Sequence, residues 1–324
     1  MASDSHILRY ALVAGAVVLA AGFAVDNAAE TEPQARHRIA LTFDDAPRGE
    51  GGFFSGEERT RRLIRELKRA GVEEAMFFVK TSHIRSEGDR KRLRQYTDAG
   101  HRLANHSHSH RWLSRTESNA YIADVAAAAR ILADFDHNDP FYRFPFLDEG
   151  RTVKKRDAVR KALAELGLAH GYVTVDNYDW YLAGRVKAVR RDGLRVDREA
   201  LRKVYLEHIL ESVAFYDEIA TNALGRSPKH VLLLHENDLA ALFIGDLVRA
   251  LRAAGWEIVG AREAYTDPIA GGLPDTLFNG QGRVAAIAHA AGTGPRELVQ
   301  HSEDEEFLDR MLDRHQVFTE VDDR

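Results

Sequence analysis

Residues 39–45 read Ile39-Ala40-Leu41-Thr42-Phe43-Asp44-Asp45, a short apolar run that ends in two carboxylates. Such a run is typical of a buried strand. We expect Asp44 and Asp45 to lie at the end of this strand and, because neighbouring side chains of a strand alternate in direction, to point different ways. One carboxylate can then bind a cation while the other faces a substrate. A carboxylate pair that stands alone is more often a turn or a helix cap.

Apolar runs alternate with amphipathic segments along the rest of the chain. Further strands are predicted over residues 75–79, 101–105, 141–144, 171–175, 231–234 and 257–259, and helices over 57–70, 89–99, 117–135, 153–166, 198–222 and 240–254. Strands that alternate with helices indicate a parallel sheet. About seven repeats favour an α/β fold with a closed or nearly closed barrel, in which functional residues lie at the carboxyl ends of the strands.

The composition narrows the chemistry. The 324 residues carry a formal net charge of −5 and include no cysteine. This composition excludes disulfides, thiolate metal sites and cysteine nucleophiles, and it leaves His, Asp and Glu as the strong metal ligands. The positive charges form no basic stripe and the sequence contains no nucleic-acid-binding motif, so we expect no nucleic-acid partner.

The N-terminus has the pattern of a targeting segment. Arg9 precedes an apolar run over residues 10–25, and small residues follow, as in a secretory signal peptide. The run is shorter than the roughly 20 residues of a spanning helix, and an uncleaved membrane anchor is the alternative. We therefore expect an exported protein, periplasmic or extracellular. Its predicted parts are a signal peptide or anchor (1–29), a linker (30–37), a barrel (38–265) and a C-terminal extension (266–324).

A histidine-rich segment follows the third predicted strand. His106 and His110 are four residues apart, which places both imidazoles on one face if the segment is helical. Together with one carboxylate they form a set that suits Zn²⁺ or another divalent transition metal. A polar loop without a metal explains the segment equally well. His108 projects elsewhere in such a helix, and we expect it to lie outside the metal site.

Three more polar clusters follow predicted strands. Arg143 ends the fourth strand, two residues before Pro145. Asp179-Trp180 puts a carboxylate next to an aromatic ring, a combination common in sugar sites, and His235 follows a run of leucines. A lone histidine in such a position is usually structural. Five such strand ends together favour a single site at one edge of the barrel.

As an ordered set these motifs resemble a known family. Thr42-Phe43-Asp44-Asp45, the His106-Ser-x-x-His110 spacing, Arg143-x-Pro145, Asp179-Trp180 and Leu233-x-His235 look like the five motifs of the polysaccharide deacetylases, carbohydrate esterase family 4. The resemblance covers roughly residues 38–265. It implies a distorted (β/α) barrel of about seven parallel strands. It also implies a metal-dependent enzyme that removes acetyl groups from N-acetylated sugars of a polysaccharide such as peptidoglycan or a chitin-like polymer.

The resemblance further implies a role for each motif residue. The metal, usually Zn²⁺, would be held by Asp45, His106 and His110. Asp44 would act as the base and His235 as the acid, the former oriented by Arg143 and the latter by Asp179. The backbone N–H of Phe146 would stabilise the oxyanion, and Trp180 and Leu233 would line the acetyl pocket.

Other functions stay open on the sequence alone. The same centre could serve an esterase for O-acetylated sugars such as xylan, because only the leaving group differs. A glycan-binding barrel without activity is a second alternative, although such proteins commonly lose a ligand or the base. A hydrolase of small non-sugar amides is a third. Phe146 stands where the family often has tyrosine, and Ala46 where it often has glycine, so substrate preference is left undecided.

Overall fold

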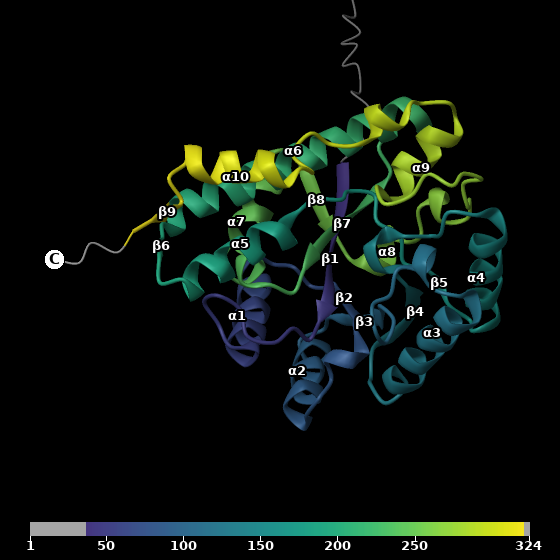
Figure 1. Ribbon diagram of the computed structural model, residues 1–324, viewed down its shortest axis with the longest axis horizontal. Coiled ribbons are helices and arrows are strands. Elements are labelled where there is room, and N and C mark those ends of the chain that lie inside the picture. Colours follow the sequence, from purple (N-terminus) through teal and green to yellow (C-terminus); the bar gives the residue numbers. More distant parts are fainter. Residues whose placement is uncertain (1–36, 321–324) are drawn as a thin grey trace, which may run out of the picture. The chain divides into compact units, whose positions relative to one another are not determined.

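The computed structural model describes residues 37–320, so the predicted signal peptide and most of the linker lie outside the described residues. Strands and helices alternate through the described chain (Figure 1). The strands of the main sheet are β1 (His37–Ala46), β2 (Met76–Val79), β3 (Arg102–Asn105), β4 (Asn138–Tyr142), β5 (Ala169–His170), β7 (Lys229–His235) and β8 (Trp256–Val259). A separate antiparallel pair consists of β6 (Arg195–Val196) and β9 (Phe318–Thr319).

The main sheet is parallel and has the order β5-β4-β3-β2-β1-β7, with β8 also paired to β1. After β5, which lies at one edge of the sheet, the chain crosses to β7 at the opposite edge. There Val175 forms a parallel bridge with Leu232 of β7, and the Leu233 N–H donates to the Val175 carbonyl at 3.1 Å. The segment after β5 therefore connects the two edges of the sheet. The predicted distorted (β/α) barrel of about seven parallel strands is confirmed.

The predicted strand 171–175 is wrong in detail. The regular strand β5 is only two residues long and precedes it, while residues 171–175 are irregular and contact both β4 and β7. Gly171 donates its N–H to the Tyr142 carbonyl at 2.7 Å, and Thr174 donates to Val231 at 3.0 Å. A segment that leaves one neighbour for another cannot keep a regular ladder. The apolar pattern predicts burial here but not this switch.

The helices cover the outside of the barrel. They are α1 (Gly56–Arg69), α2 (Glu87–Asp98), α3 (Ser118–Leu132), α4 (Val153–Glu165), α5 (Asp179–Arg191), α6 (Arg198–Leu224), α7 (Asp238–Ala253), α8 (Ala261–Ala264), α9 (Gly282–Ala290) and α10 (Glu305–Arg314). Short 3-10 turns are η1 (Thr81–His83), η2 (Leu113–Arg115), η3 (Pro145–Leu147), η4 (Pro268–Ala270) and η5 (Pro295–Leu298). In the part of the chain that the structure describes, no helix has the length and apolarity that crossing a bilayer requires.

Local sequence explains where helices begin and which face they bury. Ser55 and Glu58 form a reciprocal capping box at the start of α1, which satisfies backbone donors that the first turn leaves free. Leu63 and Leu67 on the buried face of α1 belong to the main core. In the same core the rings of Phe43 and Phe77 stack at 4.9 Å between their centroids. This packing fixes β1, and with it the position of the carboxylates at its end.

The C-terminal extension packs on the barrel domain. Figure 1 shows α10 lying along α6, with α9 near the other end of the same helix. At the far end β9 pairs with β6, and the Asp197 N–H donates to the Val317 carbonyl at 2.9 Å. The domain boundaries remain a prediction, but the described part of the extension is ordered structure that reaches the site below.

Candidate metal centre

Three side chains from two strand ends converge. Asp45 lies near the end of β1, and His106 and His110 follow β3; one ligand atom from each lies within 4.8 Å of the other two. His106 Nε2 and His110 Nε2 are 3.2 Å apart, and His110 Nε2 is 3.5 Å from Asp45 Oδ1. These atoms surround one point, as the ligands of a single cation do.

The two carboxylates of β1 both reach this site, which corrects the expectation that they point different ways. Between the pairs Phe43–Phe77 and Ala46–Val79, β1 contains one residue more than β2. Asp45 sits in this irregularity with a left-handed backbone, φ 68°. A bulge of this kind redirects a side chain that regular alternation would turn away.

The histidine segment is not helical, so the shared helix face that a helix over residues 106–110 would provide is absent. Ser107 and His110 have positive φ values of 67° and 57°, and polar contacts hold the turn. Ser107 Oγ accepts the His110 N–H at 2.9 Å, and Asn105 Oδ1 accepts the Ser107 N–H at 2.8 Å. The imidazoles converge through this turn. His108 instead lies 2.9 Å from Thr81 Oγ1, outside the metal set.

The donor atoms fit a divalent cation. Asp45 Oδ1 is buried and has no hydrogen-bond partner among the described residues, which is costly for a carboxylate unless a cation takes that place. His106 Nδ1 lies 3.0 Å from the Arg143 carbonyl, which places the proton on Nδ1 and leaves the Nε2 lone pair for a metal. Two imidazoles and one carboxylate are a common set for a catalytic metal with open positions.

Electrostatics prepares the same residues for a cation. Burial, together with the neighbouring His106, lowers the pKa of His110 to about 3, so its imidazole is neutral at physiological pH. Burial alone would raise the pKa of Asp45, but His110 and Arg48 outweigh burial and hold that pKa well below its ordinary value. A neutral imidazole and a charged carboxylate are the protonation states that bind metal.

Asp44 is held by a buried arginine. Arg143 Nη1 donates to Asp44 Oδ1 at 2.6 Å and to Thr42 Oγ1 at 2.9 Å. Its Nε donates to the Gly171 carbonyl, and its Nη2 donates to the Tyr265 hydroxyl at 3.0 Å. With every nitrogen engaged, the guanidinium has a fixed place, and Asp44 is therefore fixed too. No sequence motif predicts Tyr265.

His235 and Asp179 form a second pair. Asp179 is the first residue of α5, a helix that the sequence pattern does not predict, and its side chain is buried. Asp179 Oδ1 lies 2.7 Å from His235 Nδ1, and Oδ2 accepts the His235 backbone N–H at 2.9 Å. Burial would lower the pKa of His235, but the Asp179 charge outweighs burial and raises it above 6.5.

Phe146 lies at the rim of the site with strained backbone. It has φ 58° and the next residue, Leu147, has φ 50°, conformations that cost energy for residues other than glycine and that cluster at functional sites. The Phe146 ring is 42% exposed, stacks on Trp112 at 3.9 Å and meets the edge of His110 at 4.5 Å. Its backbone N–H has no hydrogen bond within the described residues.

These residues border one cavity of about 580 Å³, which we call the catalytic cavity. Trp180, 38% exposed, and the buried Leu233 also line it. All ten residues predicted for the site are brought together here or, for Arg143 and Asp179, directly behind its wall. No motif in the sequence predicted Arg48 and Trp112 in this lining, nor the wall that the C-terminal extension contributes with Asn279, Gly280, Gln281 and Glu305.

Comparisons with known proteins agree with this arrangement. The family model described as polysaccharide deacetylase matches residues 31–170, a range that includes both carboxylates of β1, both histidines and Arg143. No curated protein sequence matches the chain.

Solved structures are similar to this chain at low sequence identity. A carbohydrate esterase family 4 pseudoenzyme from Bacillus anthracis is 17% identical, with a TM-score of 0.50 over 71% of this chain and 66% of that one. The peptidoglycan deacetylase PdaC from Bacillus subtilis is 19% identical, with a TM-score of 0.47 over 72% and 91%. A family 4 carbohydrate esterase from Streptomyces lividans is 20% identical, with a TM-score of 0.46 over 68% and 90%.

Proposed function

We propose that this chain hydrolyses the acetamido group of N-acetylated sugars in peptidoglycan or a chitin-like polymer, with Zn²⁺ as its metal; the match of residues 31–170 to the polysaccharide deacetylase family model supports this. One observation carries this proposal. The three metal ligands Asp45, His106 and His110, which we call the metal-binding trio, border the catalytic cavity together with the base Asp44 and the acid His235. A chain that had lost catalysis would be expected to lack one of them.

The geometry suits acyl transfer to water. A bound divalent cation would activate a water molecule and polarise the acetyl carbonyl. Asp44 Oδ2 lies 3.5 Å from His106 Nε2, beside the metal set, and is placed to accept the proton of the attacking water. Arg143 holds Asp44 through its other oxygen, so the base keeps its orientation.

The remaining residues handle charge and the leaving group. As water adds to the acetyl carbon, negative charge grows on the carbonyl oxygen, and the Phe146 N–H is available to donate to it. When the C–N bond breaks, the amine needs a proton. His235 donates it from Nε2, because Nδ1 is engaged by Asp179. The products are acetate and a free amino sugar.

Zn²⁺ is the metal that the donor set favours. Two imidazole nitrogens and one carboxylate oxygen suit zinc, and the protein contains no thiolate that would favour softer ions. Metal analysis of the purified protein, paired with acetate release before and after chelation, tests this. Turnover that survives complete removal of metal would refute metal dependence.

The main alternative is an esterase for O-acetylated sugars. The same residues can serve both reactions, because an alkoxide leaving group also takes a proton from His235. Acetate release from chitin oligomers and from acetylated xylan, measured side by side, separates them. Release from xylan alone would favour the esterase, and release from neither, with metal bound, would favour the glycan-binding barrel.

We also propose that the protein is exported. The support is the apolar run over residues 10–25 behind Arg9, and the substrates named above are polymers of the cell wall or its surroundings. Fractionation of cells that express the full chain, with N-terminal sequencing of the product, tests this proposal. A product found only in the cytoplasm with its N-terminus intact would contradict it.

A further inference from the structure

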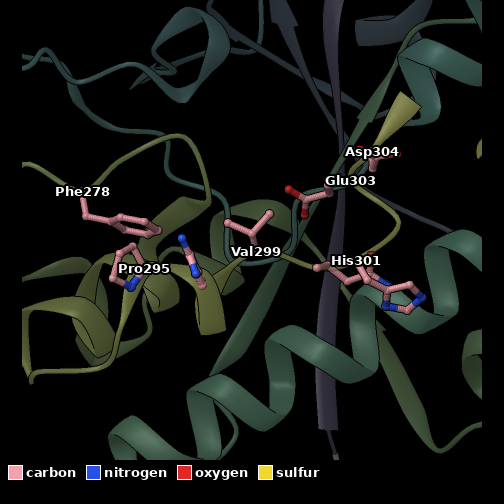
Figure 2. Close-up of a pocket in the computed structure, with 8 residues that line it drawn as sticks. Phe278, Pro295, Val299, His301, Glu303 and Asp304 are labelled. Carbon is pink, nitrogen blue, oxygen red and sulfur yellow. The ribbon is translucent and has the colours of Figure 1, made fainter. Parts of the chain in front are cut away.

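The C-terminal extension contains a second cavity that the mechanism does not use. It measures about 570 Å³, and we call it the tail cavity. Figure 2 shows its lining. The apolar side chains are Phe278, Pro295 and Val299, and the polar ones include Arg296, His301 and Glu303.

The tail cavity adjoins the catalytic cavity. Phe278 lines the former, while Asn279, Gly280 and Gln281 line the latter. A second segment also borders both cavities: Glu303 lines the tail cavity, and Glu305 lines the catalytic cavity. Residues 278–281 and 303–305 therefore form the boundary between the two cavities.

A buried tyrosine ties these two segments together. The Tyr216 hydroxyl lies 2.6 Å from Gln281 Oε1 and 2.6 Å from Glu303 Oε1. The Gly280 N–H is anchored separately, to the Leu147 carbonyl at 3.2 Å, next to the Phe146 turn. The boundary is thus fixed both to α6 and to the rim of the catalytic cavity.

Glu303 gives the tail cavity a polar group that lacks a partner. Its side chain is only 8% exposed, and its Oε2 has no hydrogen-bond partner among the described residues. In Figure 2 the carboxylate is turned toward Val299, across the cavity. A buried oxygen without a donor is costly, so a ligand that brings a hydroxyl or an amide N–H would be favoured there.

The lining also has the two surfaces that a sugar needs. Phe278 stacks on His289 at 4.8 Å, which fixes its ring, and Val299 is 40% exposed at the cavity. Apolar side chains of this kind contact the C–H face of a sugar ring. The charged and polar groups around them can bind its hydroxyls.

We propose that the tail cavity is a second sugar-binding site, which holds a unit of the same glycan whose acetyl group is removed in the catalytic cavity. This inference rests on the proposed function. The shared boundary of the two cavities favours this occupant, because a polymer bound in the catalytic cavity that extends past residues 278–281 reaches the tail cavity. Binding there favours long chains over short ones.

The test compares chitin dimer with chitin hexamer. Val299→Trp fills the tail cavity from an exposed position, and Glu303→Gln removes the carboxylate without changing its shape. For both variants we expect the hexamer-to-dimer ratio of kcat/KM to fall by about 3- to 10-fold, the effect of one or two lost hydrogen bonds or equivalent contacts. The control is Val153→Trp, at another exposed valine (51%) on α4, which should keep the wild-type ratio.

A binding measurement supports the kinetics. Titration of chitin hexamer into the Asp44→Asn protein, with and without Val299→Trp, should show weaker binding in the double variant by a similar factor. An unchanged hexamer-to-dimer ratio and unchanged hexamer affinity would overturn the tail site. If wild-type protein neither binds nor deacetylates any oligomer, the proposed function fails instead.

Discussion

Asp179 contacts His235 twice: one carboxylate oxygen lies 2.7 Å from the imidazole Nδ1, and the other accepts the backbone N–H of the same residue at 2.9 Å. The side chain and the backbone of the proposed acid are therefore positioned by one buried carboxylate. The Asn237 amide donates to that carboxylate as well, at 2.7 Å. Only the imidazole Nε2 is left to meet a leaving group.

The first prediction concerns pH. The acid must carry its proton, so activity should fall as the pH rises through the raised pKa of His235. Asp179→Asn removes the charge that raises this pKa, so the alkaline limb of the kcat profile should move to lower pH. We expect kcat to drop about 100-fold as well, within the usual contribution of a general acid. An alkaline limb that stays in place would contradict the assignment.

The raised pKa of His235 also affects the free energy of unfolding. A histidine whose pKa is raised by folding stabilises the native state fully below its unfolded pKa of about 6.5, and the contribution is lost as the pH rises through the folded value. Urea denaturation of the metal-free protein at several pH values should show this loss. The Asp179→Asn protein should show less of it.

The second prediction separates the adjacent carboxylates of β1. Asp44→Asn should reduce kcat at least about 1,000-fold while the protein keeps its metal, because Asp44 is proposed as the base and not as a ligand. Asp45→Asn should lose metal, because it weakens one of three ligands. Metal content by mass spectrometry and acetate release are measured on the same samples. Equal metal loss in both variants would refute the division of roles.

The third prediction uses the histidine turn. His106→Ala should lose both metal and activity, since it removes a ligand at the centre of the trio. His108→Ala is the matched control, because His108 contacts Thr81 and lies outside the trio. Zinc titration by calorimetry should give a much weaker site for the first variant and an unchanged Kd for the second. Tight zinc binding by His106→Ala would argue against this ligand set.

The fourth prediction concerns a buried ion cluster behind the site. Glu236, next to His235, is fully buried; it accepts from Arg92 Nη2 at 3.0 Å, from the Tyr96 hydroxyl at 2.9 Å and from the Arg48 N–H at 2.6 Å. Glu236→Gln leaves buried arginines without their counter-charge and should lower the free energy of unfolding by about 3–5 kcal/mol. Denaturant titration measures the change.

A surface ion pair gives the control for that variant. Glu263→Gln weakens a half-exposed pair with Arg38 and should cost about 1 kcal/mol or less.

Burial would raise the pKa of Glu236, but Arg59 and Arg92 outweigh burial and lower it below 4.5. The stabilisation is therefore present above pH 4.5 and is lost as the pH falls through the folded value. The Glu236→Gln protein should lack this acid-sensitive component.

The sequence predicts what depends on local pattern. Apolar runs such as residues 39–43 and 231–234 become strands because their side chains are buried on both faces, and the glycines after α1 and α2 end those helices. The motif residues lie at strand ends, where a parallel barrel brings them together. Their order along the chain, together with the family that this order resembles, therefore predicted where the site lies.

Features that depend on long-range contacts were not predictable. The turn at residues 106–110 is held by Asn105, Ser107 and Asp124, which no periodic pattern reveals. Tyr265 joins the site because the short helix α8, which follows β8, ends at Tyr265 and places its hydroxyl within reach of Arg143. The wall from the C-terminal extension depends on the packing of α9 and α10 against α6, and its sequence carries no motif.

The extra residue in β1 has a consequence for protein engineering. Asp44 and Asp45 serve one centre only because the strand is locally out of step with β2 and the backbone of Asp45 is left-handed. If the same residues were placed on a regular strand, the side chains would alternate, and one of the two carboxylates would point away from the metal centre. A design that copies this metal centre must therefore copy the bulge in β1 along with the side chains. Deletion of one residue from the bulge should abolish metal binding.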